Sequence, residues 1–123
     1  MRYILVSFTL LIIPFAVLTA IYGAEHFGIQ VYKGARLDSE EMAFLRKNTG
    51  VDGYFYRTGD SVEKVVAFYR KHPGLTPLGY DNNGGRFVKE KDGHRVYVNI
   101  DSPWQSAKGG ELSRDTRIFL INE

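Results

Sequence analysis

The chain of 123 residues contains no cysteine. It therefore forms no disulfide, offers no thiolate for catalysis or for zinc, and has no sulfur to carry the lipid of a lipoprotein. A strong charge of one sign is also lacking, because 16 basic side chains are balanced by 14 acidic ones and the formal charge is +2. A balanced chain has no electrostatic bias towards nucleic acid, so we expect no nucleic-acid partner.

The sequence also lacks a catalytic or metal-binding motif. His26, His72 and His94 lie far apart, and no pair has the spacing of metal ligands on a helix. No serine lies in the Gly-x-Ser-x-Gly context of a hydrolase. The polar segment 81–85 lacks the ligand spacing and the distal glutamate of an EF-hand loop, so we expect a turn there. The sequence predicts no catalytic residue, no metal site and no cofactor.

The longest apolar run lies near the amino terminus. Residues 3–22 are almost all apolar and carry no charge, and they follow the basic residue Arg2. Residues 1–24 are therefore expected to be a signal peptide or an N-terminal membrane anchor. The run is longer than the core of a usual signal peptide and lacks a good cleavage site, while its length suffices to cross a bilayer.

Both alternatives place the rest of the chain outside the cytoplasm, because a basic residue before an apolar segment stays on the cytoplasmic side. If the segment is cleaved, the domain is expected to be periplasmic or secreted. If it is kept, the domain is anchored in the inner membrane and faces away from the cytoplasm. In that case the protein contacts the membrane only through residues 3–22.

Residues 25–123 are predicted to form a single domain with two helices. The shorter helix is expected at about 38–48. A long amphipathic helix is expected at about 60–72, with Asp60 and Glu63 in the positions of a capping box. Its apolar stripe has helical spacing and consists of Val62, Val65, Val66 and Tyr69.

Five strands are predicted around these helices. They cover residues 28–36, 51–58, 86–90, 94–101 and 116–121. The dipeptide Asp92-Gly93 between two alternating runs is a strong hairpin signal. The sequence thus predicts an α+β fold, in which a small and mostly antiparallel sheet has the long helix on one face.

Aromatic residues are the best candidates for binding. Trp104, Tyr97, Tyr56 and Tyr54 would form an amphipathic binding surface if they shared the uncovered face of the sheet. Trp104 follows a proline in a loop and is expected to be a surface anchor. The alternative is that these rings fill the core.

Three segments of the chain resemble a group of small exported bacterial proteins of unassigned activity. They are residues 30–35, residues 56–69 with the pattern Thr-x-Asp-Ser-Val-x-Lys-Val-x-x-Phe-Tyr, and the Ser-Pro-Trp of residues 102–104. Group members often have Tyr-Pro-Gly-Ala where residues 32–35 of this chain are Tyr-Lys-Gly-Ala. The resemblance implies an α+β domain of the Gram-negative envelope and supplies no catalytic residues.

The sequence therefore predicts a non-enzymatic extracytoplasmic binding or interaction module whose partner is an envelope protein or a small ligand. Two alternatives stay open. The first is a membrane-anchored accessory subunit that uses residues 3–22 for assembly. The second is an enzyme whose site forms only in the fold. Such a site would need at least two of five side chains to converge: Asp101, Glu111, Asp115, His72 and His94.

Overall fold

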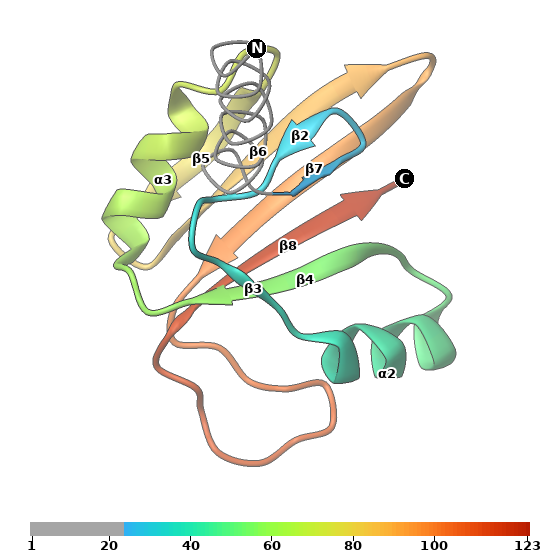
Figure 1. The fold of residues 1–123 in the computed structure, drawn as a ribbon, viewed down its shortest axis with the longest axis vertical. Helices are drawn as coiled ribbons and strands as arrows, with labels where there is room; N and C mark the ends of the chain where they lie inside the picture. The colour runs from blue at the N-terminus through green and yellow to red at the C-terminus, as the bar shows by residue number, and fades with distance from the viewer. Residues whose placement is uncertain (1–23) are drawn as a thin grey trace, which may run out of the picture.

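The structure is a computed structural model that describes residues 24–123. The predicted signal or anchor segment lies outside the described residues but for its last residue. The elements in chain order are β1 Glu25–His26, β2 Ile29–Gln30, β3 Arg36–Leu37, α2 Ser39–Thr49, β4 Asp52–Thr58, α3 Val62–Arg70, β5 Thr76–Asp81, β6 Gly84–Lys91, β7 His94–Asp101 and β8 Thr116–Asn122 (Figure 1). Neither helix of the described part has the length and apolar character needed to span a membrane.

Six strands form one antiparallel sheet in the order β3-β4-β8-β7-β6-β5. Strands β5 to β8 follow one another as a meander, and β8 also pairs with β4 along seven residue pairs from Asp52↔Asn122 to Thr58↔Thr116. Strands β1 and β2 form a separate small hairpin. The prediction of a mixed helix and sheet fold with a mostly antiparallel sheet is confirmed.

The predicted hairpin is present between β6 and β7. Lys91 pairs with His94, and the two residues between them have positive φ values of 52° at Asp92 and 82° at Gly93. A two-residue turn with both residues in this region matches the twist of the flanking strands. Glycine adopts it without steric cost, and aspartate is among the few other residues that tolerate it.

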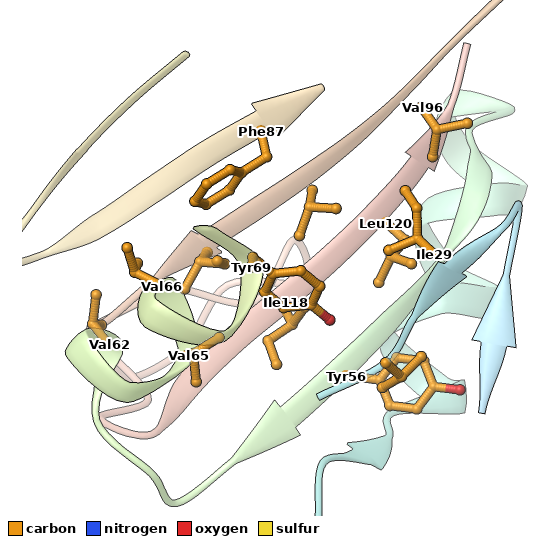
Figure 2. Close-up of a cluster of buried hydrophobic side chains, with 13 residues drawn as sticks. Ile29, Tyr56, Val62, Val65, Val66, Tyr69, Phe87, Val96, Ile118 and Leu120 are labelled. Atoms are coloured by element: carbon orange, nitrogen blue, oxygen red, sulfur yellow. The ribbon is translucent and has the colours of Figure 1, made fainter. Parts of the chain in front are cut away.

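Helix α3 packs its apolar stripe against one face of the sheet, which we call the α3 face (Figure 2). The side chain of Tyr69 is completely buried there beside Phe87. Burial of each such side chain contributes about 1.5–3 kcal/mol. The core on this face consists of Ile29, Val31, Tyr56, Val62, Val65, Val66, Tyr69, Phe87, Val96, Val98, Ile100, Ile118 and Leu120.

The chain before β3 completes this core. Ile29 and Val31 are buried in it, although β1 and β2 do not pair with the large sheet. Side chains hold this segment instead. The backbone N–H of Gln30 donates to Nε2 of His72 at 3.0 Å, and the N–H of Tyr32 donates to the hydroxyl of Tyr69 at 3.0 Å.

Helix α2 lies on the opposite face, which we call the α2 face. Asp38 accepts a hydrogen bond from the N–H of Glu41 and caps the first turn, and Gly50 ends the helix with a φ of 70°. A second buried cluster forms between this helix and the sheet. It consists of Met42, Phe55 and Trp104, with Leu45, Val51 and Phe119 packed against it.

The prediction that the second helix is long is wrong, whereas the first helix has its expected length and is shifted by one residue. α3 has nine residues and α2 has eleven, so the helix expected to be long is the shorter one. Ser61, not Asp60, caps α3 and accepts from the N–H of Lys64. The carboxylate of Asp60 instead accepts a hydrogen bond of 2.6 Å from the hydroxyl of Tyr32. A partner distant in sequence therefore outcompetes the local cap.

The strand prediction missed three pairings. The sequence did not predict strand β5, the two-residue strand β3 or the β1–β2 hairpin. The single strand expected over 28–36 is instead broken by a turn. The strand β5 carries Pro77 and a register shift between Pro77 and Gly79. Proline and glycine are both unfavourable inside strands but are tolerated at sheet edges, where β5 lies.

Candidate functional site

The α2 face of the sheet is covered on one half only. α2 packs against β4, and the loop 102–115 adds Trp104 to the same cluster. On β5, β6 and β7, by contrast, every side chain that points to this face is exposed or half-buried. We call this half, together with Ile121 on the adjacent strand β8, the open surface. It consists of Leu78, Arg86, Val88, Glu90, Arg95, Tyr97, Asn99 and Ile121.

An apolar row crosses the open surface at right angles to the strands. Val88 lies opposite Tyr97, and Tyr97 lies opposite Ile121, so the three side chains are neighbours on three adjacent strands. On the edge strand β5, Thr76 lies opposite Val88, and Leu78, which is 54% exposed, lines the same hollow as Val88 and Tyr97. Together with Arg86, Glu90 and Arg95, these last three residues line this shallow hollow of about 300 Å³.

Tyr97 is the centre of this surface and the one predicted binding residue that lies on it. The guanidinium of Arg86 lies 4.4 Å from the centroid of its ring. On the other side, Arg95 forms an ion pair with Glu90 at 3.4 Å. The neighbouring Tyr97 hydroxyl, and after it the charge of Glu90, raises the pKa of Arg95. The surface therefore combines an aromatic ring with two guanidinium groups.

Trp104 is not a surface anchor, because it is buried in the α2 cluster with an exposure of 4%. Its backbone pairs with Ser113 by two hydrogen bonds, which closes the loop and turns the indole onto Phe55. Its indole N–H donates to Asp115 at 3.0 Å. The preceding Pro103 suggested an exposed loop, but the pairing within the loop directs the ring inward.

Tyr54 and Tyr56 lie on the α3 face and so on the opposite side of the sheet from Tyr97. Tyr54 lies opposite Leu120, whereas Tyr97 lies opposite the next residue along β8, Ile121. One step along a strand reverses the direction of a side chain, so the three tyrosines cannot share one surface. The four predicted binding residues are therefore divided among three places.

The structure brings Tyr54 and Tyr56 together with His26. The imidazole stacks on the ring of Tyr54, with centroids 3.5 Å apart, and its Nε2 is 2.7 Å from the hydroxyl of Tyr56. Burial lowers the pKa of His26 and raises that of Tyr56. Because these groups hold the β1–β2 hairpin against the sheet, the cluster has a clear structural role.

The five side chains considered for an enzyme do not gather in one pocket, and His72, His94 and Asp115 line three different hollows. Asp101 pairs with Arg117, while the Asp115 carboxylate pairs with Arg57 and Trp104. His72 accepts from the backbone of β2, and His94 lies 3.0 Å from the side chain of Asn122 on β8. Glu111 lies in the exposed loop. In the range 24–123, no three histidine or acidic side chains are grouped so that they could hold a metal ion.

Most residues of the open surface were not identified from the sequence as functional. The alternation along 94–101 placed Tyr97 on the face opposite Val96, Val98 and Ile100, and the structure agrees. Arg86, Val88 and Ile121 join Tyr97 only through the pairing of β6 and β8 with β7. The one signal in the sequence is the alternation of polar and apolar residues along each strand. It shows which side chains share a face, but not which half of that face stays uncovered.

Comparisons of the chain with protein-family models, with curated proteins and with solved structures find no match.

Proposed function

We propose that this chain is a non-enzymatic binding module of the bacterial envelope that uses the open surface to bind a partner protein outside the cytoplasm. The observation that carries the proposal is the apolar row through Val88, Tyr97 and Ile121, which no helix covers within the part of the chain described. Tyrosine and arginine are the residue types that dominate binding energy at protein interfaces. Here Tyr97 lies between two arginines.

The shape of the surface favours a protein partner over an enclosed small molecule. The hollow of about 300 Å³ is at the lower limit for a ligand pocket and is shallow. An apolar centre with a charged rim is instead typical of a protein interface. The location outside the cytoplasm is supported by the apolar segment 3–22, whose length and position suit an export signal or an anchor.

A photo-crosslinking amino acid at position 88, introduced into the full chain in its own host, tests the surface directly. We expect a covalent adduct of higher mass that disappears when Tyr97→Ala or Leu78→Glu is added. Leu78 is 54% exposed, so its substitution leaves the fold intact. The matched control carries the crosslinker at Lys64, on the exposed side of α3. An adduct that persists in both variants, or that forms equally from position 64, contradicts the proposal.

The location is tested separately by the mass of the tagged chain and by the cell fraction that contains it. Recovery from the envelope is expected. A mass without the first two dozen residues identifies a cleaved signal peptide, and a full-length mass identifies an anchor. Recovery of the full-length chain from the cytoplasm contradicts the proposed location, whatever the crosslinking shows.

A further inference from the structure

Arg86 lies on the open surface and has no acidic partner among the described residues. Four other guanidiniums on this side of the molecule do have a partner. Arg46 donates to the carbonyl of Gly53, while Arg57, Arg95 and Arg117 pair with carboxylates. Within residues 24–123, no carboxylate pairs with Arg86, whose guanidinium rests on the ring of Tyr97 and is exposed to solvent.

Asn99 stands directly opposite Arg86 in the pairing of β6 with β7. Its Oδ1 is shielded from solvent and, within the described residues, has no hydrogen-bond partner. A buried acceptor without a donor costs free energy, and a group that supplies the donor recovers it. Opposite residues of antiparallel strands have Cα atoms about 4.5–5.5 Å apart, so Arg86 and Asn99 are neighbours on the open surface.

We infer that Arg86, Asn99 and Tyr97 bind the carboxyl terminus of an extended peptide. The α-carboxylate pairs with the guanidinium of Arg86, which offers a planar fork of donors that suits a carboxylate. The amide N–H of the same terminal residue donates to Oδ1 of Asn99 when the Asn99 side chain rotates towards the hollow. The terminal side chain packs on Tyr97 and Val88.

The chemistry of a peptide terminus matches this arrangement better than that of a glutamate side chain. In the terminal residue a single Cα separates the N–H donor from the carboxylate, which suits two recognition groups on opposite strands. In glutamate the carboxylate lies further from the backbone N–H. Capture of a terminal carboxylate by positioned donors is a recurring mode of peptide recognition. The inference rests on the proposed function, because it specifies the chemistry of the partner at the open surface.

The experiment uses the full-length chain, labelled with ¹⁵N, in mild detergent micelles. Three peptides are titrated and followed by amide chemical shifts. The first is acetyl-Ala-Thr-Val-Leu with a free carboxylate, and the second is the same peptide with a carboxyl-terminal amide. The third is the amide peptide with glutamate in place of threonine. We expect the free acid to bind at least about 10-fold more tightly than either amide, with shifts at residues 88, 97 and 99.

Arg86→Gln is expected to reduce the affinity for the free acid by about 10-fold and leave the weak binding of the amide unchanged. Lys64→Gln removes a cation from the exposed side of α3 and is the matched control, with no expected change. Equal affinities for the free acid and the amide overturn the inference. An equal loss of affinity for the free acid in Arg86→Gln and Lys64→Gln also overturns it. Binding of the glutamate peptide as tightly as the free acid also overturns it, because the carboxylate would then be a side chain.

Failure of this inference and failure of the proposed function are distinguishable. If the crosslink from position 88 forms and depends on Tyr97, while the peptides do not discriminate acid from amide, the surface binds a partner by other contacts. If the crosslink is absent and the free acid still binds through Arg86, the site recognises a peptide terminus but not the expected partner protein.

Discussion

The indole N–H of Trp104 donates a hydrogen bond of 3.0 Å to Oδ1 of Asp115. The other carboxylate oxygen of Asp115 accepts from Nε of Arg57 at 2.8 Å, and the guanidinium of Arg57 lies 4.9 Å from the centre of the indole ring. One carboxylate thus satisfies both a buried N–H and a half-buried cation. This relationship holds both ends of the loop 102–115 against the α2 face of the sheet.

Replacement of Trp104 with alanine is expected to destabilise the domain by about 3–5 kcal/mol, because it removes a buried aromatic ring from the second cluster. Urea unfolding measures the loss. The control is Leu112→Ala in the same loop, where the side chain is 54% exposed and a change within about 0.5 kcal/mol is expected. Equal effects of the two variants would show that Trp104 is not part of the core.

Glu41 is expected to hold the loop against α2. Its buried carboxylate accepts from the hydroxyl of Ser106 at 2.6 Å and from the N–H of Ala107 at 2.7 Å. Glu41→Ala is predicted to cost about 1–3 kcal/mol and to speed hydrogen exchange at Ala107. Glu40→Ala is the matched control, because it removes an exposed acidic residue from the same helical turn. Equal exchange at Ala107 in both variants would contradict the prediction.

The stability of the domain is expected to depend on the protonation of His26. Burial lowers its pKa in the folded state from the ordinary value of 6.5, so the unfolded chain binds a proton first as the pH falls. The contribution of His26 is complete above pH 6.5. It declines as the pH falls below this value and through the folded pKa. We expect the difference in unfolding free energy between the wild-type chain and His26→Gln to shrink between pH 8 and pH 5. A difference that stays constant over this range would refute the prediction.

Gly53 is expected to tolerate no side chain. A Cβ at this position would lie 2.2 Å from the carbonyl oxygen of Leu120 on the paired strand, where the backbone has little room to move. Gly53→Ala is predicted to destabilise the domain by about 1–3 kcal/mol or more. At Gly59 a Cβ would meet nothing within 4 Å, and its φ is not in the positive region, so Gly59→Ala is expected to be nearly neutral. The melting temperatures of Gly53→Ala and Gly59→Ala are measured by thermal unfolding. Equal values for the two variants would contradict the prediction.

Much of the fold was predictable because its signals are local. The Asp92-Gly93 turn and the alternation on both sides of it specify the β6–β7 hairpin without reference to the rest of the chain. The apolar spacing between Val62 and Tyr69 specifies a helix with one buried side for the same reason. The exact ends were less predictable, since Asp60 interacts with Tyr32, 28 residues away, instead of capping α3.

The candidate site was predictable only in part. Alternation along β7 by itself places Tyr97 on the face opposite Val96 and Val98. It does not reveal that the guanidinium of Arg86, on β6, rests on the ring of Tyr97 with no carboxylate partner, or that Trp104 turns inward. Both depend on pairing between different segments of the chain. The sequence by itself determined the absence of thiol chemistry, the mixture of helices and strands, and the direction of the side chains within the strands that it predicted. Only the tertiary structure decided which half of which face stays open, because coverage of a sheet depends on where the helices and loops of the whole chain pack.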